Sequence, residues 1–124
     1  MEAEFAEPEP TREEIDRLPG LVLLEFGTDW CPHCQALQPH LRQLLAQFPQ
    51  VRHIKVEDGK GRPLGRSFRV KLWPNLVFLR AGTVVSQLAR PAPEEMRAGF
   101  EALAGADAGG DVASNPGPAN SGKA

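Results

Sequence analysis

The two cysteines of this 124-residue chain, Cys31 and Cys34, are separated by Pro32 and His33. Two thiols at this spacing can form a disulfide with each other or bind a metal ion together. A single close pair is too few for a disulfide scaffold, so it indicates redox chemistry or metal binding. A structural zinc site needs four protein ligands, and the chain has no second cysteine pair and no histidine pair at zinc-finger spacing. Disulfide exchange is therefore favoured over zinc held with His33 or His40, and we expect no metal and no prosthetic group.

The cysteines lie between a segment typical of a strand and a segment typical of a helix. Residues 21–26 (LVLLEF) form an apolar run, as expected of a strand that is covered on both faces. Apolar side chains then recur at helical spacing over residues 37–48, and Pro32 suits the first helical turn. At such a junction, unpaired backbone N–H groups and the helix dipole stabilise a thiolate, which makes Cys31 the more reactive thiol. Cys34, one turn later, is placed to attack a mixed disulfide formed at Cys31.

The remaining segments predict a mixed α/β domain. Thr11 and Glu14 form a capping box, which predicts a short helix that ends at Pro19-Gly20. Another helix is expected to open at Pro93. The other elements predicted from the pattern of apolar residues are strands at 51–56, 75–80 and 83–88 and a loop with a short helix at 59–69. This order predicts a parallel strand pair and a closing hairpin in one sheet.

Composition divides the chain into three parts. Residues 1–10 are an acidic extension, which can add a short edge strand, and residues 11–104 form the domain. Residues 105–124 are rich in Gly, Ala, Pro, Ser and Asn, with Val112 as the one large apolar side chain. Such a segment cannot offset the entropy lost on ordering, so we expect a disordered tail.

The charges of the chain do not indicate a nucleic acid or a membrane as partner. The formal net charge is -2, from 14 basic and 16 acidic side chains. Seven basic residues lie between Arg52 and Lys71, but without the regular interleaving of aromatic side chains that stacks bases, so a solvated face is favoured. The first ten residues lack the basic start and the apolar stretch of a secretory signal, and no apolar run is long enough to cross a bilayer. We therefore expect a cytoplasmic protein.

These features together resemble the thioredoxin superfamily, over about residues 21–103. The resemblance rests on landmarks that stand at the family's positions around the cysteines: Glu25 six residues before Cys31, Trp30 directly before it, Pro39 five residues after Cys34, the Trp73-Pro74 dipeptide and Gly82. A cysteine pair alone would be weak evidence, whereas its combination with Pro74 before another apolar strand is specific.

The resemblance implies a fold and a set of roles. The fold is a central mixed sheet of four to five strands flanked by helices, with a cis-proline at Pro74 facing the cysteines. Cys31 would be the attacking thiolate, Cys34 the resolving thiol and Glu25 the proton acceptor for Cys34. The backbone of Trp73 would pair with an extended segment of the client. Two simpler interpretations are that Glu25 only ends its strand in partial contact with water, and that Pro74 is a trans proline opening an edge strand.

Three positions depart from the thioredoxin pattern. Pro32-His33 is the dipeptide of periplasmic disulfide oxidases, and a protonated His33 would stabilise the Cys31 thiolate and make the couple more oxidising. Trp73 replaces a smaller residue, and Arg90 stands where the family often has glycine. Both replacements narrow the substrate groove, so we expect a selective client.

We therefore predict a thiol–disulfide oxidoreductase that acts through Cys31 and Cys34 as a thioredoxin-like reductant. Its partners would be client proteins with disulfides or dithiols and a recycling reductase, and we expect a monomer. One alternative is a more oxidising disulfide donor or isomerase. Another is a client-binding module in which the cysteines regulate docking at Trp30, Trp73 and Pro74.

Overall fold

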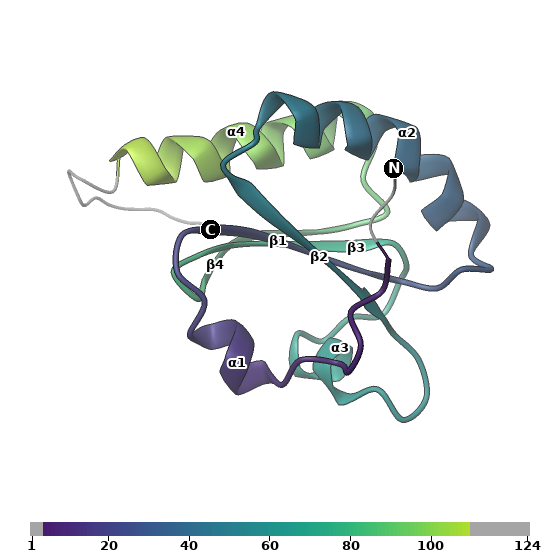
Figure 1. The fold of residues 1–124 in the computed structure, drawn as a ribbon. Helices are drawn as coiled ribbons and strands as arrows, with labels where there is room; N and C mark the ends of the chain where they lie inside the picture. Colours follow the sequence, from purple (N-terminus) through teal and green to yellow (C-terminus); the bar gives the residue numbers. More distant parts are fainter. Residues whose placement is uncertain (1–3, 110–124) are drawn as a thin grey trace.

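The strands of the domain form one four-stranded sheet in the order β2-β1-β3-β4 (Figure 1). The computed structural model describes residues 4–109. β1 (Leu21–Gly27) pairs in parallel with β2 (Val51–Glu57), whereas β3 (Asn75–Arg80) runs antiparallel to β1 and to β4 (Thr83–Ala89). The predicted parallel pair, the closing hairpin and the mixed sheet are confirmed, and the sheet has the smaller of the two predicted sizes.

Helices cover both faces of this sheet. The long helices α2 (Pro32–Gln47) and α4 (Pro93–Gly109) lie on one face, and the short helices α1 (Arg12–Asp16) and α3 (Pro63–Ser67) lie on the other (Figure 1). All of β1 is buried, because its alternate side chains point into two separate apolar clusters. This explains why its sequence is apolar without alternation.

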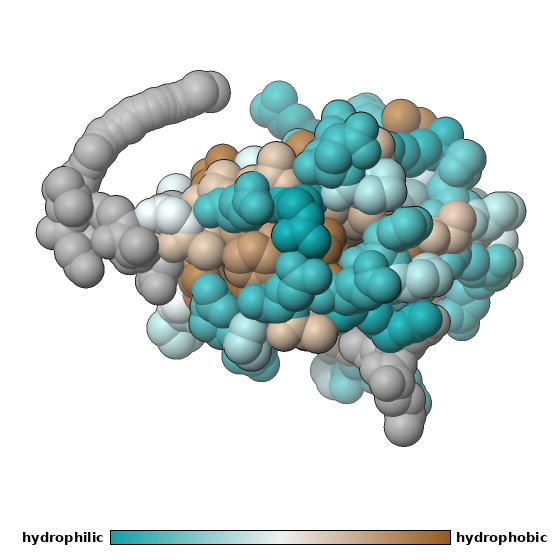
Figure 2. Space-filling view, turned by 90° about the horizontal axis from the view of Figure 1, so that it is seen from above, coloured by the Kyte–Doolittle hydropathy of each residue, from teal (hydrophilic) through white to brown (hydrophobic). Residues whose placement is uncertain are grey.

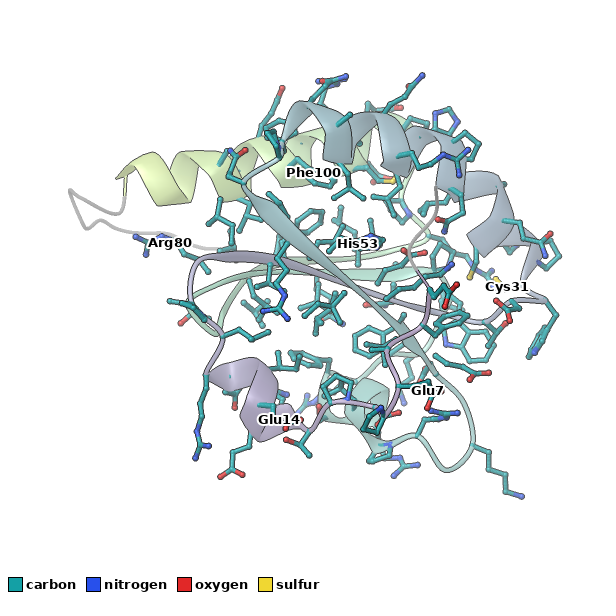
Figure 3. All side chains as sticks on the ribbon, in the orientation of Figure 1. Glu7, Glu14, Cys31, His53, Arg80 and Phe100 are labelled. Atoms are coloured by element: carbon teal, nitrogen blue, oxygen red, sulfur yellow. The ribbon has the colours of Figure 1, made fainter. Side chains whose placement is uncertain are left out.

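Aromatic packing fixes the long helices to the sheet. Phe100 points from α4 toward the sheet, where its ring meets Phe78 edge-on at a centroid distance of 5.3 Å (Figure 3). Its ring also stacks on Phe48, at the end of α2, again at 5.3 Å. Seen from above, the opposite sides of these helices carry mostly hydrophilic residues, with smaller hydrophobic areas between them (Figure 2). The two helices are therefore amphipathic, and α2 is held with its first turn beyond the end of β1.

Local signals start α1 and close the hairpin. The predicted capping box is present: the Glu14 backbone N–H donates to Thr11 Oγ1 over 3.0 Å, and the Thr11 N–H donates to Glu14 Oε1 over 2.9 Å. Gly82, in the turn between β3 and β4, has a φ of 82°. A β-carbon there would lie 2.0 Å from the carbonyl oxygen of Asp16, so the turn also needs glycine to pack against the end of α1.

The ends of the described chain differ in detail from the sequence pattern. Phe5 forms an isolated parallel bridge with Lys55, so the acidic extension follows the free edge of β2 for one residue pair. α4 continues to Gly109, five residues beyond the predicted boundary at residue 104. Ala106 and Ala108 favour a helix there, but Gly105, Asp107 and Gly109 do not, so helix propensity alone does not account for the extension. The disordered tail predicted for residues 105–124 is therefore wrong for residues 105–109, which are helical, and its remaining part, residues 110–124, lies outside the described residues. Between residues 4 and 109, no helix is long and apolar enough to span a membrane.

Candidate active site

Cys31 caps the N-terminus of α2, at the point where the chain leaves the sheet (Figure 3). The backbone N–H of Cys34 donates to the Cys31 sulfur over 3.2 Å. This is one of the N–H groups that the first helical turn leaves without a helical partner, and together with the helix dipole it stabilises negative charge on Cys31. Both cysteines are free thiols and are buried, each with 4% of its surface exposed. The geometry therefore gives the two sulfurs different environments.

Cys34 lies in the less favourable place for a thiolate. The pKa of the Cys34 thiol is raised to about 12, mainly by burial and next by a hydrogen bond with Cys31. A hydrogen bond with the Thr28 backbone lowers the pKa, and the charges of Cys31 and Glu25 raise it further. Cys34 is therefore protonated at neutral pH and needs a proton acceptor before it can act as a nucleophile.

The close approach of Cys34 to β1 depends on Gly27, the last residue of that strand. A β-carbon at position 27 would lie 2.6 Å from the Cys34 sulfur. Cys34 also lines a cavity of about 110 Å³, together with Thr28, Asp29 and Lys55. The cavity is large enough for water, so solvent can reach Cys34 from this side.

Glu25 is buried in the middle of the sheet, with 1% of its surface exposed. The Gln38 side chain donates from Nε2 to Glu25 Oε2 over 2.6 Å and to the Cys34 carbonyl oxygen over 3.1 Å. On the other side, His53 Nε2 lies 2.8 Å from Glu25 Oε1. The simpler interpretation of Glu25, a strand end in partial contact with water, is therefore wrong.

Sequence reasoning missed both partners of Glu25. Gln38 follows Cys34 by four residues, a spacing that places the two on one helical face, so a helical projection could have found it. His53 comes from the neighbouring strand, where the parallel register pairs it with Leu23. Alternation in strands then puts His53 and Glu25 on the same face of the sheet. Its 14% exposed side chain connects the buried carboxylate to the surface.

Trp73 and Pro74 lie in the segment directly before β3, and Trp73 contacts Trp30, the residue before Cys31. The peptide bond between them is cis. The Trp73 indole N–H donates to Asp58 Oδ2 over 2.8 Å, and its ring meets the ring of Trp30 edge-on at 5.5 Å. Trp30, directly before Cys31, is 70% exposed. Trp73 is half-buried, so Trp30 is the ring of this pair that is open to an incoming polypeptide.

Arg90, directly after β4, binds the backbone of Trp73 and Pro74. Its backbone N–H donates to the Pro74 carbonyl oxygen and its side-chain Nε donates to the Trp73 carbonyl oxygen, each over 2.8 Å. Arg90 has a φ of 50°, a conformation in which glycine is unstrained and other residues are uncommon. The Arg90 side chain therefore occupies the Trp73 carbonyl oxygen, which a glycine at position 90 would leave without this hydrogen bond.

A groove of about 240 Å³ lies between the first turns of α2 and the segments that carry Pro74 and Arg90. His33 and His40 line it from α2, and Pro74 and Arg90 line it from the opposite side. Both histidines are exposed, as is Pro32 at the first position of α2. Within residues 4–109, no three His, Cys, Asp or Glu side chains come together in an arrangement that could hold a metal ion.

Comparison with known proteins gives a consistent result. Residues 5–101 match the family described as Thioredoxin. Among solved structures, thioredoxin 2 from Pseudomonas aeruginosa PAO1 in its reduced form is 52% identical, with a TM-score of 0.76, and the match covers 85% of this chain and 98% of that one.

Two curated relatives are more distant. Thioredoxin from Chlamydia trachomatis is 36% identical over 55% of this chain and 67% of its own length. Thioredoxin H5 from Arabidopsis thaliana is 24% identical over 61% of this chain, and the match spans 64% of that relative, just under two thirds.

Proposed function

Because the chain belongs to the thioredoxin family, we propose that it is a thiol–disulfide oxidoreductase that reduces client disulfides through Cys31 and Cys34. The observation that carries this proposal is the asymmetry of the pair. The Cys31 sulfur accepts an N–H at the start of α2, whereas the pKa of the Cys34 thiol is raised to about 12. One thiol is thus prepared to attack, and the other is held in reserve as a neutral thiol.

The proposed reaction has two exchange steps. The Cys31 thiolate attacks one sulfur of the client disulfide, the client S–S bond breaks, and the other client sulfur leaves as a thiolate and takes a proton from water. Cys34 then loses its proton and attacks the Cys31 sulfur. The Cys31–Cys34 disulfide forms, the second client thiol is released, and two electrons have passed to the client. A reductase that supplies two electrons would restore the dithiol.

We propose that Glu25 accepts the proton of Cys34 in the second step. Two donors hold this carboxylate, Gln38 on one oxygen and His53 on the other, which keeps it oriented while it is buried. Gln38 also bonds to the Cys34 carbonyl, so it links the acceptor to the helix that carries the thiol. Gln38 and His53 act as positioning residues in this scheme.

We assign the substrate groove to Pro74 and Arg90, which line it, and to Trp73, which precedes Pro74 and contacts Trp30 outside this lining. Trp30 and Trp73 offer aromatic surface to an extended client segment, whereas Arg90 occupies the Trp73 carbonyl oxygen. A client must fit beside both side chains, which supports selectivity for particular client segments. Efficient reduction of many unrelated protein disulfides would contradict this assignment.

We assign the reducing direction together with a cytoplasmic location, because a dithiol reductant is regenerated in a reducing compartment. We also propose a monomer, because one chain supplies both cysteines of the exchange. Pro32 and His33 modulate the couple, and His33 shifts it toward oxidation when it is protonated. Equilibration of Cys31 and Cys34 in graded glutathione buffers tests the direction. The proposal requires a potential below that of the glutathione pool, and a potential above it would identify a disulfide donor instead.

Trapping of the intermediate tests the exchange chemistry itself. A Cys34→Ser variant mixed with a disulfide-linked peptide is expected to accumulate a mixed disulfide at Cys31, visible as an added peptide mass that a reductant removes. A Cys31→Ser variant provides the matched control and should accumulate none. Equal trapping by the two variants, or no trapping by Cys34→Ser, would overturn the proposal. Client binding that survives in Cys31→Ser without any exchange would favour a docking module.

A further inference from the structure

The groove beside the cysteines is basic and contains no acidic side chain among the residues that line it. His33 and His40 lie about two turns apart on one side of α2, and Arg90 lines the groove from the end of β4. Arg90 carries a permanent charge, because a guanidinium does not lose its proton in proteins. Glu95, near the start of α4, is outside the lining and accepts from the Ala92 backbone N–H over 2.7 Å. The lining therefore presents positive charge that the groove itself does not neutralise.

The Arg90 side chain is held in one orientation. Its Nε–H donates to the Trp73 carbonyl oxygen over 2.8 Å, while its backbone N–H holds the Pro74 carbonyl oxygen. Its terminal guanidinium nitrogens make no other hydrogen bond or ion pair with residues 4–109. An arginine fixed through Nε still has two parallel N–H groups at its end, and this fork matches the two oxygens of a carboxylate.

The rest of the groove suits a peptide segment. The lining also includes the buried apolar side chains of Leu37, Pro74 and Met96. Lysine side chains of a client would be repelled by Arg90, and an apolar side chain would leave the fork without a partner. A carboxylate satisfies the fork, and the anchoring at Trp73 reduces the side-chain entropy lost when it binds.

We propose that this groove selects clients that carry an Asp or Glu within two residues of the reactive cysteine, and that Arg90 binds this carboxylate. The inference rests on the proposed disulfide exchange, because the groove adjoins the helix that carries Cys31 and Cys34. Arg90 would thus determine which client disulfides are reduced, while the cysteines carry out the exchange.

The test uses fluorescence-quenched disulfide peptides in matched pairs that differ only in Glu or Gln. The exchanged residue is placed at each of the two positions before and the two positions after the cysteine. For at least one position, kcat/KM for the Glu peptide should exceed that for the Gln peptide by about five-fold at low salt, because Arg90 is exposed and the ion pair is partly screened. The preference should shrink as the salt concentration rises.

The variants separate Arg90 from general charge effects. In Arg90→Ala the Glu-to-Gln ratio should fall to about one, whereas Arg97→Ala, which loses the same charge from α4, should keep the wild-type ratio. Arg90→Lys keeps the charge without the fork and should retain only part of the preference. If Arg90→Ala does not fold, the wild-type ratios, their salt dependence and Arg90→Lys still decide the matter.

The outcomes are distinct. A ratio of one at every position in the wild-type protein, or a preference that Arg90→Ala keeps in full, would overturn the role of Arg90 while leaving the exchange activity standing. Failure to reduce any of the peptides, with a folded protein and reduced cysteines, would overturn the proposed function and this inference with it.

Discussion

Replacement of Glu25 by Gln is expected to slow the second exchange step, in which Cys34 resolves the mixed disulfide at Cys31. Glutamine keeps the shape of the side chain, and its oxygen can still accept from Gln38, but its NH2 group can only donate, so the contact with His53 requires the other histidine tautomer. Glutamine also cannot accept a proton. The first step, attack by Cys31 on the client, does not involve proton transfer to Glu25 in the proposed scheme. The defect should therefore appear in resolution and not in formation of the mixed disulfide.

The size of the defect follows from the thiol that must be ionised. At pH 7, a thiol with a pKa of about 12 is a thiolate in only about one molecule in 10⁵, against about one in 100 at the ordinary value of 9.0. A positioned proton acceptor contributes about 10² to 10⁴ in rate. Loss of the Glu25 charge also lowers the pKa of Cys34, which offsets part of the defect, so we expect about 100-fold slower resolution.

The pH dependence distinguishes a lost proton acceptor from a distorted site. Hydroxide can reach Cys34 through the cavity beside it, so resolution in the variant should speed up about ten-fold for each pH unit above 7 until the pH approaches the Cys34 pKa. The variant and the wild-type protein should therefore converge at alkaline pH.

Rapid mixing with a disulfide peptide, followed by acid quenching and mass analysis, measures the decay of the mixed disulfide directly. Glu101→Gln, which removes an exposed carboxylate from α4, provides the control and should resolve at the wild-type rate. Resolution in Glu25→Gln within two-fold of wild type at pH 7, or a deficit that stays constant up to pH 10, would refute the role of Glu25.

Three further predictions concern packing and ionisation. Gly82→Ala should lower the free energy of unfolding in urea, because the turn has a positive φ and no room for a β-carbon. Gly105→Ala has open space around it and should raise the free energy of unfolding by up to about 1 kcal/mol. Equal effects of the two changes would contradict this account. Phe100→Ala should cost about 3–5 kcal/mol of unfolding free energy, since its fully buried ring joins α4 to the sheet, and a loss below about 1 kcal/mol would contradict that role. Cys31→Ala should lower the Cys34 pKa from about 12 while leaving it above 9.0, because the hydrogen bond and the charge of Cys31 disappear but burial remains. An ultraviolet titration of the Cys34 thiolate measures this pKa, and an unchanged or higher value would contradict the prediction.

The features that depend on neighbours along the chain could be predicted from the residues alone. An apolar run followed by helical periodicity was enough to place Cys31 at a strand-to-helix junction, and the Thr11 capping box and the Gly82 turn were equally readable. These features are local, because a helix start, a cap or a tight turn is stabilised by groups only a few residues apart. The spacing of the cysteines also depends on nothing beyond one helical turn.

The surroundings that give these residues their chemistry arise instead from contacts between segments far apart in the chain. His53 reaches Glu25 because β2 pairs with β1 in one particular register, and a shift by one residue would turn it to the other face of the sheet. Arg90 reaches the Trp73 carbonyl from seventeen residues away, through the pairing of β3 with β4. Burial raised the Cys34 pKa for the same reason: the proximity of residues distant in sequence is fixed by packing of the whole domain, which no local pattern encodes.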